Sequence, residues 1–197
     1  MRIMCKSFSE NQLSFEVVIK KTTALQLADF KASENLCEGC PAYGKRWACP
    51  PFDTEKSFLF QEKIANIIAI KFKPTQKNLS PKQINDSARK HFDNIFFNIE
   101  NSTKDTLLLL AGSCICKLAD ECPKTKNKPC AYPNKKRYSL EALGYNVAKI
   151  CKEKLGFEIL WAKDNAHPQY YTLVYCILTK TDCLSEQFLR EKIYTSL

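Results

Sequence analysis

The apolar positions of this chain follow two spacings, one typical of strands and one typical of helices. Residues 13–20 alternate and are rich in Phe, Val and Ile, which predicts a strand. Residues 66–72 and 106–111 are continuous apolar runs of strand length, as expected for buried strands. Two further runs, residues 157–162 and 170–178, predict strands that pair antiparallel with each other.

Helical spacing occupies the segments between these strands. Short helices are predicted at residues 22–30 and 54–63. A longer helix is predicted after Ser80, whose side chain can cap the first turn, and Pro81 suits the first helical position. The apolar residues that follow recur at helical spacing and define one buried face: Ile84, Ala88, Phe92, Ile95, Phe96 and Ile99.

A second long helix is predicted from Ser139, which can cap it, and Glu141 suits the positive end of the helix. Gly156 supplies a left-handed stop. The inner stripe consists of Leu140, Leu143, Val147, Ile150 and Leu155. With a further helix at the end of the chain, this order predicts an α+β protein: a single domain over residues 1–197, with helices packed on a mixed β-sheet.

Two cysteine-rich loops interrupt these elements, and the first spans residues 36–52. It reads CEGCPAYGKRWACPPF and contains Cys37, Cys40 and Cys49. Two thiolates separated by two residues can bind one metal ion or one cluster edge, because the backbone turns between them. A thioredoxin-like redox pair is the alternative, but such a pair has no use for a third cysteine.

The second loop, residues 112–138, supplies four more candidate ligands: Cys114, Cys116, Cys122 and Cys130. Four thiolates complete the coordination of a tetrahedral zinc ion or of a four-iron cluster. Their irregular spacing differs from the paired knuckles of a zinc ribbon. We therefore favour iron–sulfur over zinc, with one or two 4Fe-4S clusters per chain.

The other cysteines divide into two groups. Cys151 lies on the apolar stripe of its helix and Cys176 lies inside an apolar strand, so both are expected in the core. Cys5, Cys183 and His167 are candidates for a fourth ligand of the first loop, but isolated residues of these types are more often structural. If none of these binds, the first site keeps an open iron position that would permit chemistry.

The compartment follows from the cysteines and from the start of the chain. Eleven cysteines occur in a chain of 197 residues, and its start lacks the apolar stretch of a secretory signal. We therefore expect a cytoplasmic protein. The cytoplasm keeps thiols reduced, so we expect the cysteines to bind metal rather than to form disulfides. The longest apolar runs are far below the ~18 residues that cross a bilayer, so no membrane association is expected.

The net charge of +9 raises the question of nucleic-acid binding. That charge treats every cysteine as neutral, and ligated thiolates would bring it closer to zero. Residues 117–137 contain seven Lys and Arg side chains, but only Tyr132 and Tyr138 accompany them as stacking aromatics in the second loop. We therefore do not expect nucleic acid as a partner.

The two loops together resemble an uncharacterised bacterial and archaeal family described as predicted metal-binding proteins. In the first loop the resemblance rests on Cys37, Cys40, Tyr43, Gly44, Trp47, Cys49, Pro50 and Pro51. After the second loop it rests on Arg137, Ser139, Glu141, Ala142 and Gly144. One departure is the single residue between Cys114 and Cys116, where the family pattern has two. The resemblance implies metal binding and transfers no reaction.

Four side chains near the cysteines are further candidates for cofactor binding. Tyr43 and Trp47 flank the first site, where an aromatic ring can shield a cluster from solvent or simply anchor the loop. Arg137 and Glu141 can bind a substrate carboxylate and hydrogen-bond a cluster sulfur, or can form an ordinary salt bridge and helix cap.

Three functional hypotheses follow from the sequence. The first is an iron–sulfur protein with an electron-transfer or redox role, which implies a redox partner protein. The alternative is a structural zinc protein that binds nucleic acid or a protein partner through its basic loop. The third is a metal-delivery or redox-sensing protein with exchangeable thiolates.

Overall fold

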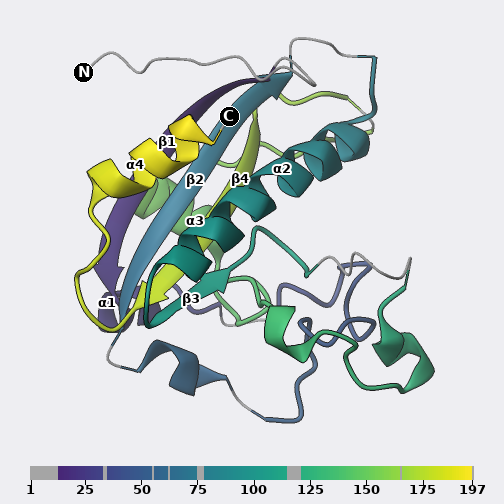
Figure 1. Cartoon of the computed structure of the whole chain (residues 1–197). Helices are drawn as coiled ribbons and strands as arrows, with labels where there is room; N and C mark the ends of the chain where they lie inside the picture. The colour runs from purple at the N-terminus through teal and green to yellow at the C-terminus, as the bar shows by residue number, and fades with distance from the viewer. Residues whose placement is uncertain are drawn as a thin grey trace.

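The structure is a computed structural model that describes residues 13–32, 35–54, 56–61, 63–74, 78–114, 121–164 and 166–196. The predicted α+β class is confirmed, because a four-stranded sheet lies between helices on its two faces (Figure 1). None of the described helices is long and apolar enough to cross a membrane.

The sheet contains β1 (Leu13–Thr23), β2 (Ile64–Pro74), β4 (Tyr171–Thr179) and β3 (Thr106–Leu109), in that spatial order. All three pairings are antiparallel, whereas the sequence suggested a mixed sheet. Strands β2 and β3 do run parallel, but β4 lies between them, so no two parallel strands are hydrogen-bonded. Helix α2 (Pro81–Ser102) connects them and makes a split β-α-β unit.

The central strands β2 and β4 are buried on both faces, which explains their continuous apolar sequences. One face packs against α2 and α4 (Glu186–Thr195), and its strand residues include Ile68, Ile70, Phe72, Leu173, Tyr175 and Ile177. The other face packs against α1 (Ala24–Ala28) and α3 (Val147–Ile150), and its strand residues include Ile67, Ala69, Val174, Cys176 and Leu178. The fold therefore has three layers.

Helix α2 forms where the sequence predicts it. The Ser80 hydroxyl accepts a hydrogen bond from the Gln83 amide at 3.3 Å, and the Gln83 side chain accepts one from the Ser80 amide at 2.9 Å. This reciprocal cap fixes the start of the helix. Every position of the predicted apolar face is buried.

Two predicted elements are wrong. The described part of residues 54–63 contains one 3₁₀ turn, η1 (Ser57–Phe60), in place of the predicted helix. Residues 157–162 form no strand, and only an isolated bridge between Lys163 and Ala166 follows them. Both edges of β4 are already paired, with β2 and β3, so this segment has no free edge there to join.

The helix predicted from Ser139 begins later than expected. Ser139 does cap a turn, because its hydroxyl accepts an amide hydrogen bond at 3.1 Å. At Gly144, however, φ is +83°, which interrupts the helical conformation, and Asn146 caps α3 instead. A π-helical turn, η4 (Cys151–Leu155), continues α3 and ends at Gly156, the predicted stop.

The two cysteine-rich loops lie side by side beyond the β3 edge of the sheet, at the lower right of Figure 1. The segments next to them are tied to the fold by backbone hydrogen bonds. The Ala32 amide donates to the Gly144 carbonyl at 2.9 Å, and the Leu110 amide donates to the Tyr138 carbonyl at 2.8 Å. The fold thus holds both loops at one place.

Candidate metal centre

The first loop folds back on itself and brings its three cysteines into one region. The Cys40 amide donates to the Cys37 carbonyl at 2.9 Å, which closes the turn between them. The Gly44 amide donates to the Pro50 carbonyl at 2.8 Å, and φ at Gly44 is +68°, a value that favours glycine. Cys49 therefore returns towards the pair, as a metal-binding loop requires.

Three thiols, two from the first loop and one from the second, act electrostatically on a fourth, that of Cys49. Burial is the main reason why the pKa of Cys49 is raised to about 11, and the thiols of Cys40, Cys37 and Cys114 raise it further. Such an effect requires the sulfur atoms to be near one another. The structure thus brings Cys114 to the cysteines of the first loop.

In this arrangement Cys114 lies with the cysteines of the first loop rather than with the other cysteines of its own loop. The sequence alone predicts that Cys114 joins Cys116, Cys122 and Cys130 in a self-sufficient second site. Cys116 lies outside the described residues. Cys122 and Cys130 are half-buried in the second loop, on either side of η2 (Pro123–Lys126). A separate site within the second loop stays a prediction.

The residues considered as a fourth ligand for the first loop lie elsewhere or are not described. Cys5 falls outside the described residues. Cys183 is exposed beyond the end of β4. The Nδ1 atom of His167 lies 2.6 Å from the Tyr171 hydroxyl, a polar contact at the start of β4. Among the described cysteines, Cys114 is the one from outside the first loop that acts on the Cys49 thiol.

Two other cysteines belong to the core. Cys151 and Cys176 are both 0% exposed, as their apolar positions predicted. Burial raises the pKa of Cys151 to about 12, with a further contribution from Glu141. None of the described cysteines forms a disulfide. All the described cysteines are therefore free thiols.

The four grouped thiols do not meet at one point. Among the described residues, no three His, Cys, Asp or Glu side chains lie close enough together to hold a single ion. Cys49 is only 6% exposed, whereas Cys40 is exposed and Cys37 and Cys114 are half-buried. With raised pKa values, the Cys37 and Cys49 thiols keep their protons at neutral pH, so metal binding must displace these protons.

The predicted aromatic residues lie at the junction of the loops. The Trp47 Nε1 donates to the Lys128 carbonyl of the second loop at 3.0 Å, and the Lys124 ammonium lies 5.5 Å from the ring centroid. The Tyr43 hydroxyl accepts a hydrogen bond from the Asn35 side chain at 3.2 Å. Trp47 thus bridges the two loops. Its shielding of a cluster stays a prediction.

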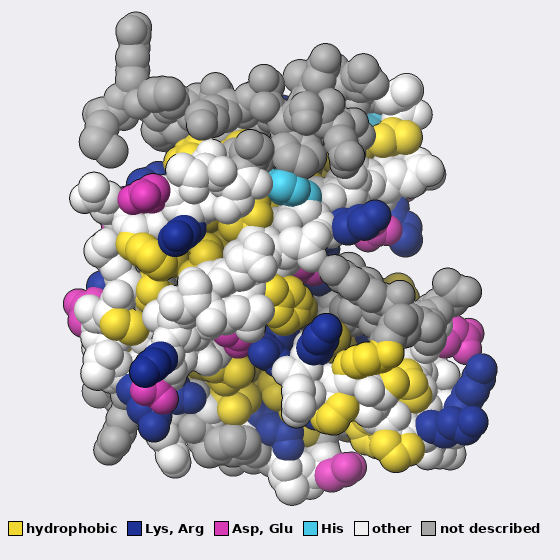
Figure 2. Space-filling view, in the orientation of Figure 1, with side chains coloured by type: hydrophobic (Ala, Val, Ile, Leu, Met, Phe, Trp, Pro, Cys, Tyr) yellow, Lys and Arg dark blue, Asp and Glu magenta, His cyan; other side chains and the backbone are white. Residues whose placement is uncertain are grey.

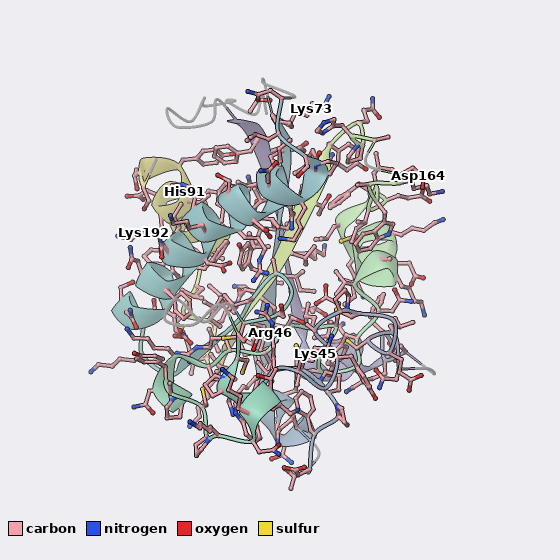
Figure 3. All side chains as sticks on the ribbon, turned by 90° about the vertical axis from the view of Figure 1, so that its right-hand side faces the viewer. Lys45, Arg46, Lys73, His91, Asp164 and Lys192 are labelled. Carbon is pink, nitrogen blue, oxygen red and sulfur yellow. The ribbon has the colours of Figure 1, made fainter. Side chains whose placement is uncertain are left out.

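Arg46 was missed by the sequence analysis, although it links the two loops directly. Its Nη1 atom donates to the Cys114 carbonyl at 2.6 Å. Figure 3 shows Arg46 and Lys45 together among the loops, away from His91 on α2. Its position between Cys40 and Cys49 was the one signal in the sequence.

Glu141 lies beside Cys37, on the turn that precedes α3. The Cys37 thiol donates to the Glu141 carbonyl at 3.5 Å. The residue as a whole is half-buried, yet its Oε2 atom is buried and has no hydrogen-bond partner among the described residues. Burial raises the pKa of the carboxyl, and hydrogen bonds from its own amide and from Ser139 offset only part of this effect.

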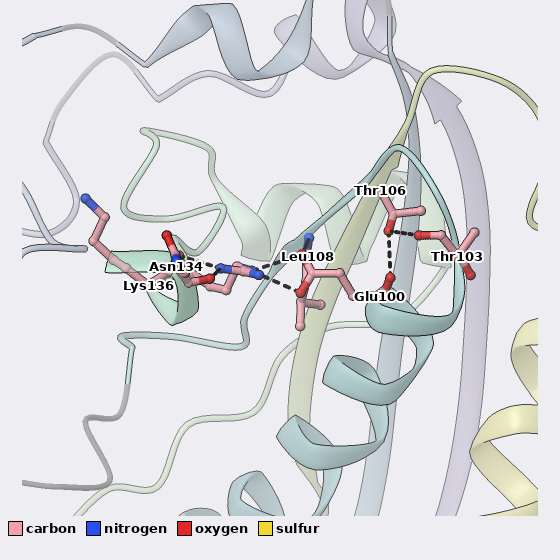
Figure 4. A network of polar contacts seen from close by, with 7 residues as sticks. Glu100, Thr103, Thr106, Leu108, Asn134 and Lys136 are labelled. Atoms are coloured by element: carbon pink, nitrogen blue, oxygen red, sulfur yellow. Dashed lines mark hydrogen bonds and ion pairs between the residues drawn. The ribbon is translucent and has the colours of Figure 1, made fainter. Parts of the chain in front are cut away.

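Arg137, the last predicted site residue, forms a salt bridge in the structure. Its Nε donates to both Glu100 oxygens, at 2.9 and 3.0 Å, and its Nη1 donates to the carbonyls of Asn134 and Lys136 (Figure 4). Glu100 also accepts from the Leu108 amide at 2.8 Å. Arg137 thus connects the second loop to α2 and β3. This is the ordinary salt bridge that the sequence offered as the alternative to substrate binding.

The buried carboxyl of Glu141 predicts a pH dependence of stability. The folded protein holds this proton more tightly than the unfolded chain, so stability falls as pH rises above the ordinary carboxyl pKa. Glu141→Gln removes this dependence. The measurement is the free energy of unfolding of the metal-free protein in urea, for the variant and for wild type. The difference, variant minus wild type, should be larger at about pH 8 than at about pH 5, by about 1 kcal/mol or more.

The matched control is Glu38→Gln, at an exposed position of the first loop. This substitution should follow the wild-type pH profile throughout. A Glu141→Gln profile parallel to wild type would show that the carboxyl titrates alike in both states.

The fold and the position of the loops define a class: an α+β protein in which two cysteine-rich loops contact each other at one edge of the sheet. Over residues 25–178 the sequence matches the family described as "Predicted metal-binding protein (DUF2284)", and the chain belongs to this family. The match spans both loops and confirms the resemblance that the sequence analysis stated. Comparison with curated proteins and with solved structures gave no match.

Proposed function

We propose that this protein carries a 4Fe-4S cluster on Cys37, Cys40, Cys49 and Cys114 and uses it to transfer electrons. The observation that carries the proposal is the contact between the two loops: the Arg46 side chain of the first loop donates to the Cys114 carbonyl of the second loop at 2.6 Å, which places Cys114 beside the first loop. Four cysteine ligands are the usual complement of such a cluster. The role of the bound group would be to accept and donate single electrons.

The arrangement of the thiols favours a cluster over one zinc ion. Zinc holds each sulfur at about 2.3 Å, so four thiolates on one ion must nearly touch. In a four-iron cluster each thiolate binds a different iron, and the sulfurs stand further apart. The irregular spacing of the cysteines in the second loop also differs from the paired knuckles of a zinc ribbon.

The surface around the loops suits exchange of electrons with a partner protein. Cys40 is exposed, so a cluster bound there would lie close to the surface. Figure 2 shows Lys and Arg side chains beside hydrophobic ones over this region, and Lys126, Lys128 and Lys135 are exposed. Such a surface would attract an acidic redox protein. A reducing compartment such as the cytoplasm would keep the ligands available.

Anaerobic purification and metal analysis test the proposal. The protein should be brown, with a visible thiolate-to-iron charge-transfer band and about four irons and four sulfides per chain. About eight of each would extend the proposal to a second cluster. A colourless protein with one zinc ion per chain would reject it and favour a structural zinc site.

A further inference from the structure

We propose that Arg46 is a positioning residue that holds Cys114 against the cysteines of the first loop and offsets part of the negative charge of the bound cluster. This inference rests on the proposed function, because it concerns metal held by these thiols. It adds a residue that the cysteine pattern does not contain.

Arg46 is linked to both parts of the thiol group. Within its own loop, its carbonyl accepts a hydrogen bond from the Cys49 amide at 3.0 Å. Its side chain reaches the second loop, where Nη1 donates to the Cys114 carbonyl at 2.6 Å across 68 positions of sequence. The side chain is half-buried, and a hydrogen bond from a charged donor is stronger than a neutral one. One residue thus connects the backbones of two ligands.

The segment that carries Cys114 is held from its other side by the core. On α2, Arg89 donates through Nη2 to the Ser113 carbonyl at 2.8 Å. The preceding residue, Gly112, has φ of +86°, and a Cβ there would lie 3.5 Å from the same guanidinium. Arg89 therefore fixes where the segment leaves β3. Arg46 fixes where it meets the first loop.

Charge supports the same role. The Arg46 guanidinium lies where the two ligand-bearing segments meet, with its Nη1 atom against the Cys114 carbonyl. A 4Fe-4S cluster with four thiolate ligands is an anion, and reduction makes it more negative. A nearby guanidinium stabilises the reduced form more than the oxidised form, which raises the reduction potential. Arg46 should thus affect both retention of the metal and its potential.

The experiment compares Arg46→Gln, Arg46→Lys and Lys45→Gln in the metal-loaded, full-length protein. Lys45→Gln is the matched control, because it removes one positive charge from the neighbouring, exposed position (Figure 3). Two quantities are measured: the rate of metal loss to excess EDTA and the reduction potential. Far-UV circular dichroism checks that each variant is folded.

Arg46→Gln should lose metal about tenfold faster than wild type or more, and its reduction potential should fall. Arg46→Lys keeps the charge but not the planar donor group, so its potential should stay near wild type while its metal loss accelerates. Lys45→Gln should behave as wild type in the EDTA assay. Equal rates of metal loss for Arg46→Gln and Lys45→Gln would overturn the positioning role.

The outcome is separable from that of the proposed function. If the wild-type protein holds zinc, the cluster proposal fails on metal analysis alone. The EDTA assay then reads retention of zinc by the same thiols, and still decides whether Arg46 positions Cys114. A variant with weakened metal retention in an otherwise folded chain supports the inference with either metal.

Discussion

The Cys114→Ser protein should lose its metal as completely as the Cys49→Ser protein, although the two residues belong to different loops. Both cysteines belong to the proposed set of ligands, because Arg46 of the first loop holds the Cys114 carbonyl at 2.6 Å, and each would bind one position of the cluster. A serine hydroxyl is a harder donor than a thiolate and binds iron or zinc poorly in its place. Metal per chain after desalting should fall more than about tenfold in both variants.

Two other cysteine variants provide the controls. Cys183→Ser changes an exposed residue beyond β4 and should retain metal like wild type. Cys122→Ser separates the two arrangements of the second loop. Two separate sites, one in each loop, would give a different result. Cys114→Ser and Cys122→Ser would then lose the same fraction of the metal, Cys49→Ser would retain that fraction, and the assignment of Cys114 to the first loop would be wrong.

The parts of the fold that the sequence predicted well are those with strong local signals. Helix α2 was found from the cap at Ser80 and from an apolar stripe that repeats through the whole helix. Strands β2 and β4 were found because burial on both faces leaves continuous apolar runs. These signals lie within a few residues of the element that they specify.

The errors arose where long-range contacts decide the structure. Residues 157–162 have a strand-like composition, but both edges of β4 are occupied, and no local pattern reveals that. The antiparallel sheet likewise follows from the position of β4 between β2 and β3. The late start of α3 depends on Gly144, whose positive φ interrupts the helix that the apolar stripe suggests.

In the candidate site too, the sequence predicted the features that depend on local signals and missed those that depend on long-range contacts. The spacing of Cys37, Cys40 and Cys49 predicts metal binding by the first loop, because these cysteines lie close together in the sequence. The approach of Cys114 depends on how the two loops meet, so the sequence assigned this cysteine to its own loop. Arg46 was missed for the same reason, since its partner lies in the other loop.

The largest effect on stability is expected from Arg137→Met. Glu100 has a side chain only 7% exposed, and without Arg137 its charge would keep the Leu108 amide as a partner but lose its cation. Removing one member of a buried ion pair costs about 3–5 kcal/mol. Urea unfolding of the metal-free protein should show this as a lower midpoint with an unchanged slope.

An exposed salt bridge on α2, the helix that carries Glu100, provides the comparison. Lys82 and Asp86 lie one helical turn from each other, and the Lys82 Nζ atom is 2.6 Å from the Asp86 Oδ2 atom. Their side chains are 86% and 51% exposed. Lys82→Met should change the free energy of unfolding by no more than about 0.5 kcal/mol, because water solvates either charge alone. A loss for Arg137→Met as small as that of Lys82→Met would mean that water reaches Glu100 in the variant. The salt bridge would then fasten the second loop without stabilising the core.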